Sequence, residues 1–538
     1  MAAAPSMVSV RLDEVVRWRG DHPAYHFRGR SMSYRELGWQ VRKIASGLAS
    51  NGVRPGDRIA VLTRNRPEYF VVSQAIWRAG AVLVPVNVLL SRDEVVHVLR
   101  DSEATCVVAG GDLAELASTA SAEVGDVLRV VLDSDAARHG DLTWGELLDS
   151  GDDQAPPRAP RPDRLAIIAY TSGTTGVPKG AMLDDRHLAD AMANVAAHLR
   201  LAENDNFLQV FPVHSVAPGL IGGWLTAWIG SECAVLERFD VAEIARVIES
   251  RRVACFAMVP TMLYDLLRFE FARDPDFSSV RYIQAGGAAV PDRIRGELAR
   301  RWDIEMIKSY GSTECSYVSL DHPGAPAVPG ASGQVLGHIR LDVRTPGGDL
   351  LGRGEVGELC VGGAPAAPRP FRPVLGYWND PVKSTEALAG GVFHTGDLGY
   401  VDEAGFVFVV DRLKDMIIRG GNNIYPAELE RVLREDARVH DAYVVGVTDP
   451  RLGEVPKAYL VRGDVASGPT GDATASDLTA PDLVVRDIVA RANATLGRHK
   501  QIAEAEFIDP ADLPRNAMNK VLKRELAARA NASRPVTA

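Results

Sequence analysis

At 538 residues, 46% of them hydrophobic, the chain is longer than one hydrophobic core usually organises, so two or more globular domains are expected. The net charge of −10 is modest, and the 60 lysines and arginines are scattered along the sequence, which argues against a nucleic-acid-binding protein. The five cysteines lie far apart without a C-x-x-C pair, so reduced thiols are expected in place of a disulfide framework or a zinc site.

The N-terminal residues lack the basic and apolar segments of a secretory signal. The most apolar window, residues 216–230, is interrupted by Pro218 and four glycines and is closed by Glu232, so it is expected in the core and not across a membrane. These features predict a cytoplasmic protein without a transmembrane segment.

The first hundred residues alternate between patterns typical of helices and of strands. Ser33 and Glu36 have the spacing of a capping box, and apolar residues recur at helical spacing as far as Asn51. A second helix is expected at 68–79 and a third after Ser91. Short apolar runs predict strands at residues 59–62, 81–84 and 105–109. This order of elements predicts βαβ units and therefore largely parallel sheets.

An apolar run at 165–169 leads directly into the sequence YTSGTTGVPKG at 170–180. Its glycines free backbone N–H groups to turn toward phosphate oxygens, its hydroxyls add donors, and Lys179 supplies a compact positive charge. The spacing differs from the Walker motif, because the lysine follows Gly176 by three residues. A flexible surface loop would explain the glycines but not the lysine and threonines in this order, so a polyphosphate-binding loop is predicted.

Further short motifs follow this loop in the sequence. They are GGA at 286–288, YGSTE at 310–314, HTGD at 394–397, DRLKD at 411–415, GGNNIYP at 420–426 and PRNAMNK at 514–520. Together with the loop, and in this order almost from end to end of the chain, they resemble the motifs of the adenylate-forming superfamily, which comprises acyl-CoA synthetases, nonribosomal adenylation domains and firefly luciferases.

The resemblance implies an α/β multidomain fold. A large N-terminal domain, residues 1–411, is expected to contain mainly parallel sheets sandwiched by helices and a β-barrel-like subdomain. A hinge at 412–415 would lead to a small, mobile α+β lid at 416–538. Pro- and Gly-rich connectors are expected at 155–162 and 362–373, and an exposed loop at 463–481.

The resemblance also implies roles for individual residues. The phosphates of ATP are expected to contact Thr171, Ser172, Gly173, Thr174, Thr175 and Lys179. The adenine is expected beside Gly286, Gly287 and Ala288, because small residues let the backbone approach it, and beside Tyr310, whose ring offers a stacking face. The next residues of the second motif, Gly311, Ser312 and Thr313, are also expected to contact the nucleotide. Asp397 would accept the ribose hydroxyls and Arg412 would reach the same nucleotide. Thr171 and Glu314 supply hard oxygen ligands for Mg²⁺.

Four residues are expected to act in catalysis: Lys520, His214, Thr171 and Glu314. Lys520 would stabilise the charge that develops when a carboxylate attacks the α-phosphate, although the family usually has glycine before this lysine and here Asn519 precedes it. His214 would flank the acyl group, and a histidine satisfied in the core is an equally good interpretation. Lys414 would be the hinge residue, and Gly420 and Gly421 would border the channel for the thiol arm of coenzyme A.

The predicted function is ATP-dependent activation of a small-molecule carboxylic acid to its acyl-adenylate with release of pyrophosphate, followed by transfer to coenzyme A. ATP, Mg²⁺ and coenzyme A are the expected cofactors, and a homodimer is an allowed assembly. The main alternative is a stand-alone adenylating enzyme that passes the acyl group to a carrier protein or an amine. A luciferase-like oxygenase and a nucleotide-binding regulator without turnover fit less well, the regulator because it would not require Lys520.

Overall fold

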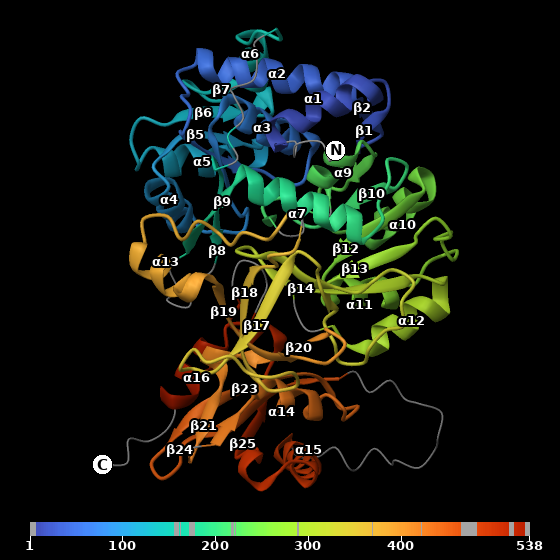
Figure 1. Ribbon diagram of the computed structural model, residues 1–538, viewed down its shortest axis with the longest axis vertical. Helices are drawn as coiled ribbons and strands as arrows, with labels where there is room; N and C mark the ends of the chain where they lie inside the picture. Colours follow the sequence, from blue (N-terminus) through green and yellow to red (C-terminus); the bar gives the residue numbers. More distant parts are fainter. Residues whose placement is uncertain are drawn as a thin grey trace. The chain divides into compact units, whose positions relative to one another are not determined.

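The computed structural model describes residues 7–154, 161, 163–171, 178–216, 220, 222–287, 290–367, 369–420, 422–463, 481–515 and 521–532. The chain divides into two compact units (Figure 1). The first unit comprises residues 1–342, 360–394 and 401–407, and the second comprises 343–359, 395–400 and 408–538. The hinge predicted at 412–415 falls within the second unit, and its role as a hinge stays a prediction.

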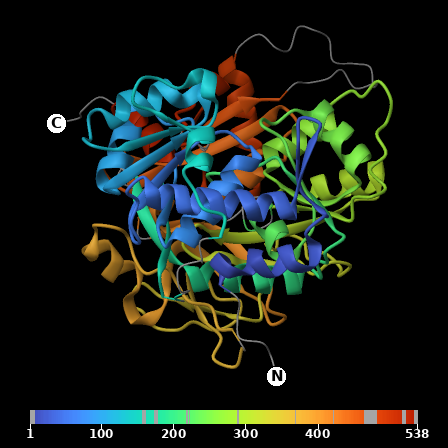
Figure 2. The ribbon, with the colours of Figure 1, turned by 90° about the horizontal axis from the view of Figure 1, so that it is seen from above.

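The first unit begins with helices that form where the sequence predicts them. Ser33 caps the second helix by accepting from the backbone N–H of Glu36 at 3.1 Å, whereas the Glu36 carboxylate accepts from Gln40. A complete capping box forms instead at Ser91 and Glu94. The helices are α1 (Val8–Arg19), α2 (Tyr34–Ser50), α3 (Pro67–Ala79), α4 (Arg92–Asp101), α5 (Ala114–Ser121) and α6 (Trp144–Asp149). Helices α1 and α2 pack side by side (Figure 2).

A seven-stranded sheet holds the predicted βαβ units. Its order is β7-β6-β5-β3-β4-β8-β9, and every neighbouring pair is parallel except the last. The strands are β3 (Arg58–Leu62), β4 (Val82–Pro85), β5 (Ala104–Ala109), β6 (Leu128–Val131), β7 (Leu142–Thr143), β8 (Leu165–Thr171) and β9 (Lys179–Asp184). The predicted strands and helices of this region are therefore confirmed within one or two residues.

A nine-stranded sheet forms the rest of the first unit's core. Its order is β16-β15-β14-β13-β12-β10-β11-β1-β2, parallel from β14 to β1 and antiparallel at both edges. The strands are β1 (Pro23–Phe27), β2 (Arg30–Ser33), β10 (Asn206–Gln209), β11 (Cys233–Val235), β12 (Val253–Met258), β13 (Tyr282–Ala285), β14 (Glu305–Ser312), β15 (Ser316–Leu320) and β16 (Gln334–Val335). The helices are α7 (Asp185–His198), α9 (Gly223–Ile229), α10 (Val241–Arg251), α11 (Pro260–Arg268) and α12 (Asp292–Trp302).

Helix α3 is buried on nearly all sides, which explains why its sequence is apolar around the whole circumference. The indole N–H of Trp77 donates to the carbonyl of Ala166 on β8 at 3.0 Å. The same indole packs against Trp224 of α9, with ring centroids 5.4 Å apart. Trp224 in turn donates to the Ser73 hydroxyl of α3 at 2.9 Å. The window at 216–230 thus contributes to the core, as its composition predicts.

A separate four-stranded sheet has the order β17-β18-β19-β20. Its strands are β17 (Ile339–Arg344), β18 (Gly357–Gly363), β19 (Phe393–Val401) and β20 (Val407–Arg412), and helix α13 (Pro381–Ala387) precedes β19. The division between the two units runs through these strands.

The second unit continues with a five-stranded α+β part. Its sheet has the order β22-β21-β24-β23, with β25 paired to β24 in parallel. The elements are β21 (Ile417–Arg419), β22 (Asn422–Ile424), α14 (Pro426–Leu433), β23 (Val439–Asp449), β24 (Gly453–Arg462), α15 (Pro481–Thr495), β25 (Glu504–Phe507) and α16 (Lys523–Ala532). The predicted α/β multidomain fold with a small α+β C-terminal part is confirmed.

Among the described residues, no helix is both long and apolar enough to span a membrane. All five cysteines are free thiols in buried positions. Burial raises the pKa of the Cys106 thiol to about 12, so this group is un-ionised and unreactive near neutral pH.

Candidate active site

The loop predicted to bind phosphate is flanked by the antiparallel strands β8 and β9. Thr171 is the last residue of β8 and Lys179 is the first residue of β9, and the two residues are paired across the ladder. The loop therefore leaves from and returns to the carboxyl end of β8, where open α/β sheets bind ligands. The predicted contacts Ser172, Gly173, Thr174 and Thr175 lie outside the described residues.

Three hydroxyl groups surround the Glu314 carboxylate, which lies in the turn between β14 and β15. Its Oε1 accepts from the hydroxyl of Tyr377 at 3.1 Å and from that of Thr171 at 3.5 Å. Its Oε2 accepts from the hydroxyl of Ser312 at 2.9 Å. The fold thus brings together Thr171, Ser312 and Glu314, which the sequence assigned to one site from positions 143 residues apart.

Tyr377 is a site residue that the sequence analysis missed. It stands in a Gly-Tyr-Trp sequence, after the proline-rich stretch that was interpreted only as a connector. Two large aromatic residues behind a glycine were the signal that could have marked it. The ammonium of Lys179 lies 6.0 Å from the centroid of the Tyr377 ring, within the range of a cation–π contact. Tyr377 therefore donates to the predicted metal ligand Glu314 and lies beside Lys179, the lysine predicted to bind phosphate.

The backbone behind Glu314 has an unusual conformation. Ser316 has a φ of +53°, which a residue with a side chain rarely adopts. A Cβ atom at Gly311, on the facing strand, would lie 1.8 Å from the Ser316 carbonyl oxygen, so only glycine fits there. The close approach of β14 and β15 at this point fixes the start and the end of the turn that carries Glu314.

His187 of α7 stabilises the same turn. Its Nδ1 lies 3.0 Å from the carbonyl oxygen of Arg372 and its Nε2 lies 2.8 Å from the hydroxyl of Ser316. Because a carbonyl only accepts, Nδ1 carries a proton, whereas the Ser316 hydroxyl can donate to a neutral ring or accept from a charged one. Burial lowers the pKa of His187 to about 4, so the ring is neutral at pH 7.

Burial also lowers the pKa values of His214 and His338 to about 4, from an ordinary value of 6.5. Between pH 6.5 and 4 the unfolded chain therefore binds more protons than the folded chain, so stability falls as the pH is lowered through this window. Each pKa unit corresponds to about 1.4 kcal/mol.

We expect the unfolding temperature of the wild-type protein to fall between pH 7 and pH 4.5. His338→Gln should make this dependence weaker, because glutamine does not ionise. His139→Gln is the matched control, since His139 is exposed and its replacement should leave the slope unchanged. A melting temperature that stays constant from pH 7 to 4.5 would contradict the assignment of these histidines as neutral buried groups.

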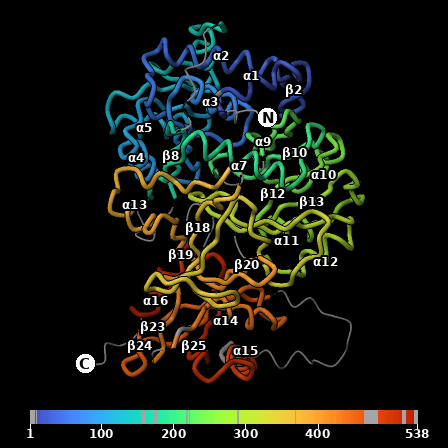
Figure 3. The backbone as a smooth tube through the Cα atoms, in the orientation of Figure 1, coloured from blue at the N-terminus to red at the C-terminus, as the bar shows by residue number. Residues whose placement is uncertain are grey.

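The adenine side of the predicted site lies where β13 and β14 end side by side. The chain runs from β13 through α12 and returns to β14 as its parallel neighbour (Figure 3). A Cβ atom at Gly286 would lie 2.2 Å from the Ser309 hydroxyl, and Gly287 has a φ of +80°. The backbone conformation therefore favours glycine at position 287, whereas a larger residue at position 286 would displace the Ser309 side chain. Tyr310 follows Ser309 on β14 and packs partly buried against the core.

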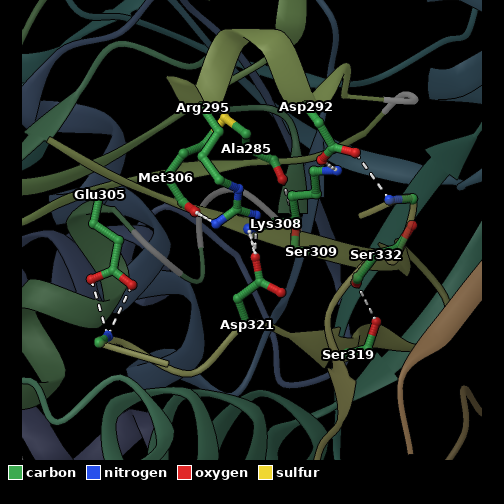
Figure 4. Close-up of polar contacts among 12 residues, drawn as sticks. Ala285, Asp292, Arg295, Glu305, Met306, Lys308, Ser309, Ser319, Asp321 and Ser332 are labelled. Atoms are coloured by element: carbon green, nitrogen blue, oxygen red, sulfur yellow. Dashed lines mark hydrogen bonds and ion pairs between the residues drawn. The ribbon is translucent and has the colours of Figure 1, made fainter. Parts of the chain in front are cut away.

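Polar contacts fix the positions of β13, β14 and α12 (Figure 4). The ammonium of Lys308, which is only 4% exposed, pairs with Asp292 in the first turn of α12. The other Asp292 oxygen accepts from the N–H of Gly330 at 3.0 Å. Arg295 pairs with Asp321 at 2.7 Å. These contacts hold the segment that leads from Gly286 to Tyr310, and they lie outside the predicted nucleotide contacts.

The second unit contains the residues predicted to bind the ribose and to act in the second half-reaction. Asp397 of β19 and Arg412 at the end of β20 form an ion pair of 2.5 Å, so the two predicted nucleotide contacts touch each other. The N–H of Asp397 donates to the Thr395 hydroxyl at 3.0 Å. Lys414 lies in a single 3₁₀ turn, Leu413–Asp415, and Gly420 has a φ of +56° after β21.

His214 is partly buried in a turn after β10, and its low pKa is explained by desolvation alone. Neither its predicted role beside the acyl group nor the core interpretation is tested by this geometry. The predicted contacts Ala288 and Gly421 and the predicted catalytic residue Lys520 lie outside the described residues. Thr313 lies in the same turn as Glu314.

Comparison with known proteins places the chain in a family. The family model described as AMP-binding enzyme matches residues 12–369, and that of the AMP-binding enzyme C-terminal domain matches residues 428–520. Over 504 residues the chain is 35% identical to a feruloyl-CoA synthase of Amycolatopsis sp, covering 93% of this chain and 94% of the relative. It is 32% identical over 515 residues to an indoleacetate–CoA ligase of Aromatoleum aromaticum, covering 94% and 95%.

Among solved structures, the chain is similar to ATP-bound MatB from Rhodopseudomonas palustris. The TM-score is 0.86 at 27% sequence identity, and the match covers 98% of this chain and 99% of that chain. The predicted activity, AMP-forming activation of a carboxylic acid and formation of its coenzyme A thioester, is confirmed at the level of the family. The chain belongs to the AMP-binding enzyme family, the adenylate-forming superfamily that its motifs predict.

Proposed function

We propose that this chain activates an aromatic carboxylic acid with MgATP and transfers the acyl group to coenzyme A. The observation that carries the proposal is the Glu314 carboxylate, which accepts from the Thr171 hydroxyl at the start of the glycine-rich loop. Carboxylate and hydroxyl oxygens are ligands that Mg²⁺ prefers, and Lys179 at the end of that loop supplies charge for the phosphates. In this proposal Thr171 and Glu314 bind the metal that accompanies ATP.

The remaining nucleotide contacts are proposed from the motifs together with their local geometry. Tyr310 stacks on the adenine, and Gly286 and Gly287 let the backbone approach its edge. Asp397 accepts from the ribose hydroxyls, and its ion pair with Arg412 orients the carboxylate. Each of these roles follows from residue type and position in the fold.

The second half-reaction is proposed to use the C-terminal lid. Lys520 stabilises the transition state of adenylation. Rotation of the lid about Lys414 then carries Lys520 away from the site. Gly420 and Gly421 border the entry of the thiol arm of coenzyme A. Gly420 has a positive φ, a backbone conformation that glycine adopts more easily than other residues. The domain limits 1–411, 412–415 and 416–538 belong to the same proposal.

An aromatic acid is proposed because the relatives at 35% and 32% identity are named for feruloyl and indoleacetate groups. The small residue Gly287 leaves room for a planar acyl group, since an added Cβ atom would meet Val259 only at 3.7 Å. The imidazole of His214 is neutral at pH 7 and would place a flat, uncharged surface beside the aromatic ring of the bound acid. Ferulate, indoleacetate, benzoate and a medium-chain fatty acid form the informative panel.

Transfer to a carrier protein is a second candidate for the acceptor. The chain is 32% identical over 522 residues to a fatty acid–[acyl-carrier-protein] ligase, ScoC, of Streptomyces coeruleorubidus, covering 94% of this chain and 92% of the relative. ATP and coenzyme A as substrates, together with five free thiols, support a cytoplasmic reaction. The homodimer stays a prediction.

The test measures pyrophosphate release and acyl-thioester formation for each acid in the panel. We expect an aromatic acid to release pyrophosphate, and added coenzyme A to yield AMP and the acyl-CoA in equal amounts. If the adenylate persists with coenzyme A and is discharged only by a carrier protein, the second candidate is correct. If no acid releases pyrophosphate, the proposed activity is wrong.

A further inference from the structure

The segment that carries Tyr377 is bound to the phosphate-loop strand as an additional edge. The N–H of Leu375 donates to Met182 O at 2.9 Å, and the N–H of Met182 donates to Gly376 O at 3.0 Å. The N–H of Trp378 then donates to the carbonyl of Gly180 at 2.8 Å. Residues 375–378 therefore follow β9 closely, and the Tyr377 backbone is fixed relative to Lys179, the first residue of that strand.

The C-terminal end of α4 holds the same segment and the start of the phosphate loop together. The indole N–H of Trp378 donates to the carbonyl oxygen of Asp101, the last residue of α4, at 2.9 Å. The hydroxyl of Tyr170 donates to the carboxylate of the same Asp101 at 2.6 Å. Tyr170 is the neighbour of Thr171, and Trp378 is the neighbour of Tyr377. Asp101 therefore fixes the backbone next to both residues whose hydroxyls donate to Glu314 Oε1.

Tyr377 is held as a hydrogen-bond donor. Its hydroxyl lies 3.1 Å from Glu314 Oε1 and donates to it, because a carboxylate oxygen only accepts. Ser312 donates to Oε2, so each oxygen of the Glu314 carboxylate accepts a hydrogen bond from a different side chain. A carboxylate held in this way is oriented before any ligand arrives.

We propose that Tyr377 is a positioning residue that sets the metal requirement of adenylation, by orienting Glu314 through its hydroxyl and the Lys179 ammonium through its ring. This inference rests on the proposed function of the Glu314 site. The two contacts are separable, because phenylalanine keeps the ring and loses only the hydroxyl. The hydroxyl acts on the metal through Glu314, and the ring acts on the phosphates through Lys179.

Tyr377→Phe should raise the half-saturating Mg²⁺ concentration for pyrophosphate release about tenfold, since a hydrogen bond to a charged group is lost. At saturating Mg²⁺ its kcat and its KM for ATP should return to within about twofold of wild type. Tyr377→Leu should show the same shift in Mg²⁺ and, in addition, a higher KM for ATP, because the Lys179 ammonium loses its aromatic neighbour.

In the background of Glu314→Gln, Tyr377→Phe should produce no further change in the Mg²⁺ dependence. Tyr69→Phe is the matched control, because the buried Tyr69 hydroxyl has no hydrogen-bond partner among the described residues, and its loss should leave the Mg²⁺ dependence unchanged. The inference is overturned if Tyr377→Phe has a wild-type Mg²⁺ dependence, or if the shift persists without the Glu314 carboxylate.

Calorimetric titration of ATP at several Mg²⁺ concentrations, without any acid, separates this inference from the proposed function. The same tenfold shift should appear there for Tyr377→Phe, because metal and nucleotide binding precede the chemistry. Wild-type binding with no pyrophosphate release from any acid would overturn the proposed function alone. An unshifted binding curve for Tyr377→Phe would overturn the positioning role alone.

Discussion

Replacing Lys520 by alanine should slow acid-dependent pyrophosphate release about 10²–10³-fold, because a positioned electrostatic group of this kind stabilises the charge on the α-phosphate. Binding of ATP should change little. The effect should be confined to adenylation, since the lid is proposed to carry Lys520 away before coenzyme A reacts. The measurement is single-turnover pyrophosphate release with a competent acid.

Supplied with synthetic acyl-adenylate, Lys520→Ala should form thioester at close to the wild-type rate. Lys500→Ala is the matched control in the same unit, because the Lys500 ammonium pairs with Glu428 at 2.7 Å on the surface and such pairs contribute little. Equal losses in both half-reactions for Lys520→Ala would show that this lysine serves folding or general binding, and the proposed role would be wrong.

Glu314→Gln is expected to have the second large effect, a fall in pyrophosphate release of about 10²-fold or more. Glutamine keeps the size of the side chain and an oxygen that can accept from Thr171 and Tyr377, but it removes the charge that is proposed to bind the metal. The loss should therefore be accompanied by a much weaker dependence on Mg²⁺.

Glu305→Gln at the start of β14 is the control for this change. Its carboxylate accepts from the N–H of Gly324 at 2.9 Å (Figure 4). Within the described part of the chain, it forms no hydrogen bond with the hydroxyls of Thr171, Ser312 and Tyr377. The control should retain wild-type activity and Mg²⁺ dependence. If Glu314→Gln retains them as well, the metal is bound elsewhere.

Local signals in the sequence were sufficient for the elements of the first sheet. Ser91 and Glu94 form the capping box that their spacing predicts, and Gly80 ends α3 in the left-handed conformation at a φ of +79°. Such signals act within one or two turns, so they can be read without knowledge of the partner elements. The order of the motifs likewise predicted the family, because the motifs are spread over nearly the whole chain. The chain in turn spans nearly the whole length of its relatives.

Contacts between distant segments could not be predicted in the same way. Tyr377 and Glu314 are 63 residues apart, and His187 and Ser316 are 129 residues apart. Nothing in the local pattern around His187 indicates a partner with a positive φ on another strand. The ion pair between Asp397 and Arg412 was not predicted either, because neither motif indicates that β19 and β20 are neighbouring strands.

The division of the chain shows the same limitation. Residues 343–359 and 395–400 group with the C-terminal part although they lie upstream of it in the sequence. A boundary read from composition along the chain finds the change of character near residue 411. It cannot find segments that join a unit from far upstream.

The most direct measurement is a crystal structure of the protein with ATP and Mn²⁺ in place of Mg²⁺, because the anomalous signal of manganese locates the ion independently of the phosphates. We predict one ion bound to a Glu314 carboxylate oxygen at about 2.1 Å, bridging to the ATP phosphates, with the Tyr377 hydroxyl still donating to that carboxylate. The ligands should include oxygen atoms only. An ion bound away from Glu314, or a Glu314 side chain turned away from the phosphates while ATP is bound, would contradict this site.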